Sequence, residues 1–137
     1  MTAKEFLQRV RGIDRRIEWS TERAERVRAR LEAGRMSKIT GMPRGGGGED
    51  WTKTADDLIE LEREINARTR EMCRLKRLGI EAVERVEEAR LREVLELYYI
   101  DAHTWNQVAE MMERTVRHVQ RLNVMALEKV KVPEGVE

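Results

Sequence analysis

The chain has 137 residues, of which 39% are charged and only 4% aromatic, with two prolines and a formal net charge of +1 at pH 7. Its abundant Glu, Arg, Leu, Ala and Met lose little side-chain entropy in a helix, whereas sandwiches and barrels need β-branched and aromatic residues on pleated faces. The composition argues against all-β and doubly wound folds. It predicts an all-α protein of one domain or two small ones.

Membrane, metal and enzyme classes find little support in the sequence. No stretch approaches the roughly 20 apolar residues of a membrane span, and charge occupies the N-terminus, where a signal peptide needs an apolar core. We therefore expect a soluble, cytoplasmic protein. Cys73 is a single cysteine and the two histidines are distant, so we expect no disulfide, metal site or cofactor. Neither His103 nor His118 has a nucleophile or carboxylate at a convincing spacing, so we expect no enzyme.

Apolar or small residues recur at heptad spacing in the first part of the chain and would form a narrow stripe along a helix. Thr2 and Glu5 have the spacing of a capping box, and we expect the helix that they begin to end at Gly34. A stripe as narrow as this one must be covered by another helix. The apolar or small residues, separated alternately by four and three positions, are Phe6, Val10, Ile13, Ile17, Ser20, Ala24, Val27 and Leu31.

The segment 34–51 is expected to be a glycine-rich loop. Four consecutive glycines, Gly45 to Gly48, would each cost a helix about 1 kcal/mol. The helical pattern resumes after Thr54, and the two helices predict an antiparallel, coiled-coil-like hairpin over residues 1–78, through which the protein would form homo-oligomers. The heptad positions of the second helix are Leu58, Leu61, Ile65, Met72 and Leu75, with Arg68 at the position that breaks the pattern.

From Gly79, which interrupts the pattern, shorter helices indicate a compact domain over 79–137. Its first two helices would carry the apolar residues of 80–86 and of 91–98. The domain would then end in a pair of helices joined by a tight turn.

This last pair has the pattern of a helix-turn-helix. Thr104 and Gln107 have capping-box spacing at the start of one helix, and Thr115 would cap the next, which is basic. Glu113 and Arg114 would form the turn. The small side chain of Ala109 would lie where the two helices cross. Two short helices with such a turn are typical of DNA-binding proteins.

These residues resemble region 4 of sigma-70-type transcription initiation factors, the domain that reads the promoter element at about minus 35. The resemblance rests on Arg92–Tyr99, Thr104–Ala109 and Thr115–Val130. The whole chain, including Gly-Met-Pro-Arg from Gly41, resembles phage and prophage regulators of late-gene transcription of the ArpU type. The resemblance includes no region that would bind the minus 10 element, so an autonomous sigma factor is not expected.

The resemblance places DNA-contacting positions at the start of the last helix, on Val116, Arg117, Gln120 and Arg121, with His118 beside them. Helical spacing adds Val124 to the exposed face of Arg117, Gln120 and Arg121. Arg can grip guanine and Gln can grip adenine bidentately, while Val can pack on a thymine methyl. The candidate DNA-binding residues are thus Thr115, Val116, Arg117, His118, Gln120, Arg121 and Val124.

At two positions the residue differs from the one that is usual in related helix-turn-helix proteins. Glu113 stands in the turn where many repressors have glycine, and it brings negative charge near the duplex. Val116 is apolar where the sigma family places a basic residue. The preferred DNA sequence should therefore differ from a bacterial minus 35 element.

The leading hypothesis is a phage-encoded transcriptional regulator in the bacterial host cell, which binds double-stranded DNA through its C-terminal domain. The hairpin would mediate self-association or contact with host RNA polymerase. One alternative is a small terminase-like subunit for DNA packaging, because such subunits also join a helix-turn-helix to oligomerising helices. Another is a coiled-coil protein that binds RNA polymerase without reading DNA, which the acidic excess of the last sixty or so residues keeps open.

Overall fold

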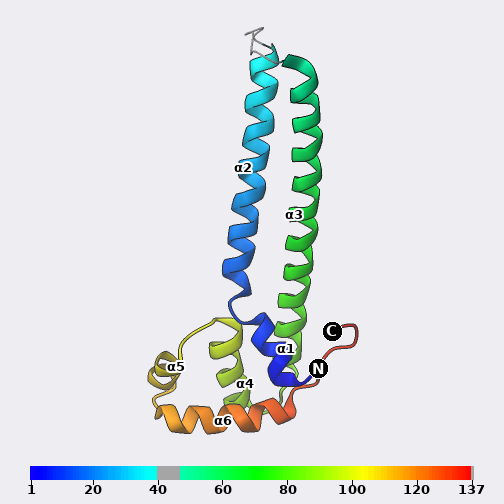
Figure 1. The fold of residues 1–137 in the computed structure, drawn as a ribbon. Helices are drawn as coiled ribbons and strands as arrows, with labels where there is room; N and C mark the ends of the chain where they lie inside the picture. The colour runs from blue at the N-terminus through cyan, green and yellow to red at the C-terminus, as the bar shows by residue number, and fades with distance from the viewer. Residues whose placement is uncertain (40–46, 137) are drawn as a thin grey trace. The chain divides into compact units, whose positions relative to one another are not determined.

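The computed structural model describes residues 1–39 and 47–136, and all regular structure in these ranges is helical (Figure 1). This confirms the all-α prediction. None of the helices in the described parts of the chain has an apolar stretch sufficient to span a membrane. The elements in chain order are α1 (Ala3–Val10), α2 (Ile13–Ile39), α3 (Gly47–Glu84), α4 (Ala89–Leu95), the π-helix η1 (Glu96–Ile100), α5 (Trp105–Met111) and α6 (Val116–Lys129).

The chain divides into two compact units. We call Arg16–Met72 the hairpin unit, and Met1–Arg15 together with Cys73–Glu137 the terminal unit. These divisions do not follow the boundary expected at residue 78. The first 15 residues and the segment 73–78 belong with the C-terminal helices, although the heptad pattern groups them with the hairpin.

The N-terminal helix begins as expected and ends early. Thr2 Oγ1 accepts from the Glu5 backbone N–H at 3.1 Å and Glu5 Oε2 accepts from the Thr2 N–H at 3.1 Å, which confirms the capping box. The expected continuous helix to Gly34 is wrong, because the chain leaves α1 at Arg11 and Gly12 has φ +77°. Glycine adopts this left-handed conformation without steric penalty. A separate helix, α2, then starts at Ile13.

In the hairpin unit, α2 and α3 lie side by side and antiparallel (Figure 1). Ser20 bonds to Thr69 through their hydroxyls at 2.7 Å, and Arg28 pairs with Glu62 at 2.8 Å, so residue numbers rise along α2 as they fall along α3. This confirms the predicted hairpin for these residues. Its seam buries the side chains of Ala24, Val27 and Leu58 and half-buries Ile17, Leu31, Ile65 and Met72.

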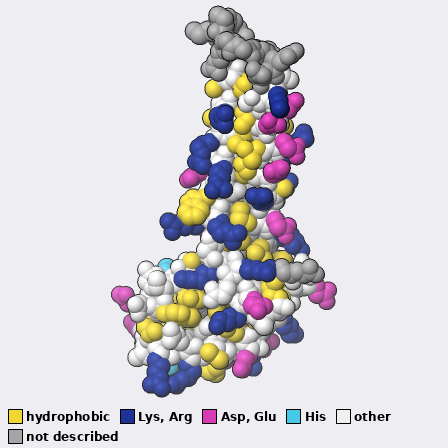
Figure 2. Space-filling model, viewed as in Figure 1, with side chains coloured by type: hydrophobic (Ala, Val, Ile, Leu, Met, Phe, Trp, Pro, Cys, Tyr) yellow, Lys and Arg dark blue, Asp and Glu magenta, His cyan; other side chains and the backbone are white. Residues whose placement is uncertain are grey.

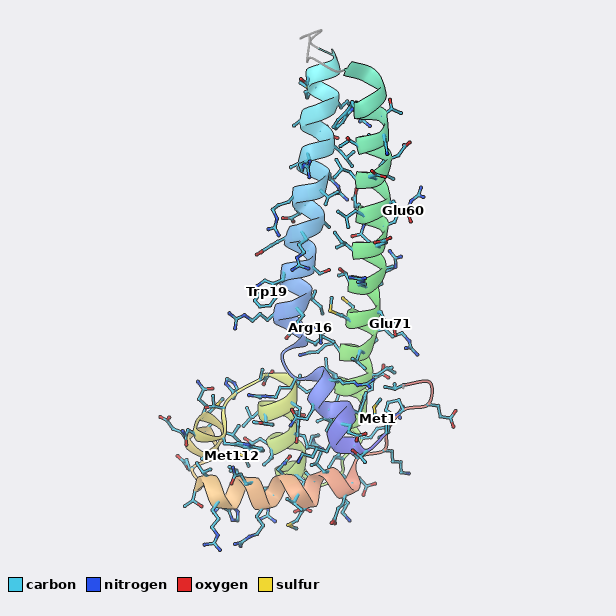
Figure 3. The ribbon with its side chains drawn as sticks, viewed as in Figure 1. Met1, Arg16, Trp19, Glu60, Glu71 and Met112 are labelled. Atoms are coloured by element: carbon cyan, nitrogen blue, oxygen red, sulfur yellow. The ribbon has the colours of Figure 1, made fainter. Side chains whose placement is uncertain are left out.

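Helical structure extends further into the segment 34–51 than expected. Gly34 lies within α2 and packs against the Trp51 ring, and a Cβ at residue 34 would collide with that ring. Trp51 is therefore a packing anchor, whereas Trp19 is 52% exposed and points away from α3 (Figure 3). Gly47 and Gly48 fall in α3, which corrects the expectation that this glycine run lies wholly in a loop. The Gly-Met-Pro-Arg motif from Gly41 lies outside the described residues.

The core of the terminal unit joins helices from both ends of the chain. Phe6, Leu7 and Val10 of α1 are buried against apolar side chains of the last turns of α3, of α4, η1 and α6. Each fully buried side chain of this size stabilises the fold by about 1.5–3 kcal/mol. The first part of the heptad stripe is thus covered by the last turns of α3 together with the C-terminal helices. The other core residues are Ala82, Val83, Val86, Leu91, Val94, Leu95, Tyr99, Leu122, Ala126 and Val130.

Gly79 does not interrupt α3, contrary to expectation, and the apolar residues of 80–86 extend that helix or directly follow it. The next expected helix, 91–98, is confirmed as α4, which continues into η1. The carbonyl end of η1 leads through Ala102 and Thr104 into α5.

Candidate nucleic-acid interface

The helix pair α5 and α6 is defined by two hydroxyl caps. Thr104 Oγ1 accepts from the Gln107 N–H at 3.2 Å, and Gln107 Oε1 accepts from the Thr104 N–H at 2.9 Å. Thr115 Oγ1 accepts from the His118 N–H at 3.1 Å. Both caps are confirmed. Each satisfies a backbone N–H that has no partner within the helix, so the two helix starts are fixed in position.

The turn between the helices depends on Glu113, which has φ +56°. The Arg114 N–H donates to the Ala109 carbonyl at 2.9 Å and closes the end of α5. Met112, labelled in Figure 3, lies where α5 gives way to α6. A left-handed conformation is the reason that glycine suits this position, and Glu113 adopts it at a steric cost.

The two helices pack through a small cluster of Val108, Ala109 and Val119. Ala109 is 5% exposed and lies against α6, as expected for the residue at the crossing. A larger side chain would force the helices apart, because buried sites tolerate little added volume. Trp105 packs at the edge of this cluster.

One face of α6 is buried against the protein, and the opposite face is exposed. Val119, Leu122, Asn123 and Ala126 are buried. Arg117, Gln120, Arg121 and Val124 are exposed, with Val124 61% exposed, and they follow i, i+3, i+4 and i+7 spacing on one side of the helix. Figure 2 shows Lys and Arg side chains gathered over the N-terminal half of α6.

The remaining candidates occupy different environments. Thr115 is exposed, but its hydroxyl is engaged in the cap. Val116 is half-buried and packs against the Val108, Ala109 and Val119 cluster. His118 is half-buried, and among the residues that the structure describes its buried Nε2 atom has no hydrogen-bond partner. The structure therefore gathers four of the seven candidates on one exposed face and sets Val116 and His118 toward the protein.

A buried polar pair behind α6 escaped the sequence analysis. Asn123 is 9% exposed, and its Oδ1 finds no hydrogen-bond partner in the described parts of the chain. Burial raises the pKa of Tyr99, and a hydrogen bond with the Asn123 side chain lowers it in part. The position of Asn123, four residues after Val119 in the apolar stripe, could have signalled that it faces inward.

Arg11 and Lys76 were also missed. Both reach backbone carbonyls between Tyr98 and His103 from distant parts of the sequence. No short motif contains these contacts, since Arg11 and Tyr98 are separated by 87 positions. Within the described residues, no group of three or more His, Cys, Asp or Glu side chains is placed to hold a metal ion.

Comparison with known proteins identifies one part of the chain. Residues 88–132 match the family described as sigma-70, region 4, and this segment contains α4, η1, α5 and α6. No curated protein and no solved structure matches the chain. The match confirms the resemblance for the C-terminal helices.

Proposed function

We propose that the sigma-70 region 4-like domain of residues 88–132 binds double-stranded DNA through the exposed face of α6, and that the protein thereby acts as a transcriptional regulator. The observation that carries the proposal is the grouping of Arg117, Gln120 and Arg121 on a helix whose opposite face is packed on α4 and α5. In a helix-turn-helix, the start of the second helix enters the major groove.

The chemistry of these side chains suits reading of base edges. Arg117 and Arg121 each carry a planar fork of donors that matches O6 and N7 of guanine, and Gln120 can bond N6 and N7 of adenine. Val124 can contact a thymine methyl. Val116 and His118 would contribute by supporting the helix, because both are half-buried.

Charge around the helix favours phosphates. Residues 115–131 carry Arg117, Arg121, Lys129 and Lys131 against the single acid Glu128. Such a local excess attracts DNA even though the whole chain is nearly neutral. Contacts of this kind position a protein on the duplex without specifying sequence.

The biological setting that we propose is late-gene transcription of a phage or prophage. The resemblance of the whole chain to phage and prophage regulators of the ArpU type supports a role at late genes, and host RNA polymerase is a candidate partner of the same domain. Self-association through the hairpin unit would place two reading helices on one DNA. A second copy raises affinity through effective concentration without any new contact.

Salt-dependent DNA binding is the test. Fluorescence anisotropy with fragments of the surrounding genome should show binding at micromolar protein or below, weakening between about 50 and 200 mM salt as counterions are released. The double variant Arg117→Ala, Arg121→Ala should lose this salt-dependent DNA binding. If the wild-type protein shows no salt-dependent binding, the proposal fails. Binding to isolated RNA polymerase would then favour the alternative without DNA, and a ring-shaped oligomer at a packaging site would favour the terminase-like alternative.

A further inference from the structure

The carbonyl end of η1 is held by side chains that come from elsewhere in the terminal unit. The last carbonyls of a helix have no partner within it, and a nearby cation commonly meets them. η1 has no basic residue in its last turn. Arg11, which follows α1, and Lys76, in α3, meet these carbonyls instead.

Arg11 makes three contacts at this place. Its guanidinium donates to the carbonyl oxygens of Tyr98 and of His103, the latter at 2.9 Å. The same guanidinium lies 3.9 Å from the centre of the Tyr98 ring. The Tyr98 ring in turn stacks on the Trp105 ring, with centroids 3.7 Å apart and an interplanar angle of 10°. Arg11 is thereby linked through Tyr98 to α5. Trp105 is the first residue of α5.

Lys76 fixes the same connection at a second point. Its Nζ donates to the Ile100 carbonyl at 2.6 Å and pairs with Asp14 Oδ2 at 3.0 Å. The Lys76 side chain is 15% exposed and its bond to the Ile100 carbonyl is partly buried, whereas Asp14 is 67% exposed, so solvent screens the ion pair more than it screens the bond to the carbonyl. Ala102 lies between Ile100 and His103, whose carbonyls are held by Lys76 and Arg11, and it has φ +59°. A non-glycine residue holds this conformation only where its surroundings enforce it.

We propose that Arg11 and Lys76 are positioning residues of the DNA-binding domain, which fix the link from η1 to α5 and so the placement of α6. This inference rests on the proposed function. α5 supports α6 through the Val108, Ala109 and Val119 cluster, so a displaced α5 would shift the reading helix. Both residues lie outside the matched segment 88–132, and neither is among the candidate DNA contacts.

The identity of the side chain at residue 11 matters as well as its charge. A guanidinium presents donors in a fixed fork and a flat face for stacking, so it can bond two carbonyls and cover a ring at once. A lysine ammonium has the same charge without the fork or the flat face. Arg11→Lys therefore separates geometry from charge.

The test uses the full-length protein and two readouts. The first is the Trp105 indole N–H resonance in a nitrogen-correlated NMR spectrum, identified by its loss in Trp105→Phe. The second is DNA affinity by anisotropy, measured well below the melting temperature of each variant. Arg11→Lys should move the Trp105 resonance and weaken binding by roughly tenfold, because α6 then occupies its binding-competent position in a smaller fraction of the molecules.

Matched variants distinguish positioning from charge and from direct contact. Lys4→Gln removes a positive charge from an exposed position on α1 and should leave the Trp105 resonance and the affinity essentially unchanged. Arg117→Ala should weaken binding without moving the Trp105 resonance. Lys76→Met should also move the Trp105 resonance and weaken DNA binding. If Arg11→Lys fails to fold, these two readouts on Lys76→Met test the positioning role instead.

Two results would overturn the inference. One is an Arg11→Lys protein with an unmoved Trp105 resonance. The other is a moved resonance with unchanged affinity in a folded variant, which would reduce Arg11 to a purely structural role. Failure of the proposed function is recognised separately, because the wild-type protein itself would then show no DNA binding.

Discussion

The backbone of α3 at Gly79 packs directly against the side chain of Val10 in α1: a Cβ at residue 79 would lie 2.7 Å from Val10 Cγ2 and 2.8 Å from Val10 Cγ1. Val10 is fully buried, so it has little room to move. This contact explains why a glycine stands inside a helix, where alanine would otherwise be favoured by about 1 kcal/mol.

Gly79→Ala should lower the free energy of unfolding by about 1–2 kcal/mol, because overpacking of a filled core costs more than the helix propensity gains. Denaturant unfolding measures the change. The double variant Gly79→Ala, Val10→Ala should be less destabilised than the sum of the two single variants, since the second change removes the collision. Additive effects would mean that residues 79 and 10 do not collide.

Arg117→Ala and Arg121→Ala should each weaken binding to a preferred DNA site by about 1–3 kcal/mol and relax the preference at one base position. Lys129→Ala and Lys131→Ala remove the same charge from the far end of the segment, and they should weaken all sequences alike and reduce the salt slope by about one phosphate contact. Val124→Ala should matter less, because it removes only apolar contact. A binding series on randomised sites at several salt concentrations separates these outcomes; equal effects of all four basic residues would argue against base reading by α6.

Glu113→Gly should raise the free energy of unfolding by about 1 kcal/mol, because glycine adopts the left-handed φ of +56° at no steric cost. Glu110→Gly is the matched control. Glu110 lies within α5, where glycine should instead destabilise by about 1 kcal/mol. Thermal unfolding of both variants gives the comparison.

Glu113→Gln separates the charge from the backbone. It keeps the left-handed strain and removes the negative charge, so it should tighten DNA binding at low salt without stabilising the fold. Equal stability of Glu113→Gly and Glu113→Gln would show that strain at residue 113 is not released by glycine.

Tyr99 should make the fold sensitive to alkaline pH. Burial raises its pKa above the ordinary value of 10.0, so the folded protein holds this proton more tightly than the unfolded chain does. The stability gained from neutral Tyr99 is therefore fully present below pH 10 and is lost as the pH rises from there toward the folded pKa. Tyr99→Phe should abolish this part of the alkaline loss, and Tyr98→Phe, which leaves Tyr99 in place, should retain it. Stability measured by denaturant at a series of pH values decides the matter.

The pairing of Tyr99 with Asn123 predicts a second outcome for the same site. Tyr99→Phe alone leaves the buried Asn123 amide without its partner and should cost about 1–3 kcal/mol. Replacing both, as Tyr99→Phe with Asn123→Leu, should restore most of the stability, because the Asn123 amide no longer has to be buried. A double variant as unstable as the single one would contradict the pairing.

Features that depend on residues close together in the chain could be predicted from the sequence alone. The caps at Thr2, Thr104 and Thr115 are confirmed, because each bond joins residues three positions apart and needs no other part of the chain. The exposed face of Arg117 and Arg121 follows in the same way from the helical period. The resemblance to sigma-70 region 4 is confirmed for the segment where these local signals are densest.

The segments that cover each helix face, and the reason for each glycine, became evident from the folded chain and not from the sequence. Heptad spacing marks Phe6 as inward-facing, but any apolar surface could cover it, and the C-terminal helices do. Gly12 follows the end of a helix and has a positive φ, whereas Gly34 and Gly79 lie inside helices, and a neighbouring side chain there occupies the space that a Cβ would need. Arg11 finds its carbonyls 87 and 92 positions away. Such contacts form only when distant segments fold together, so local spacing carries no trace of them.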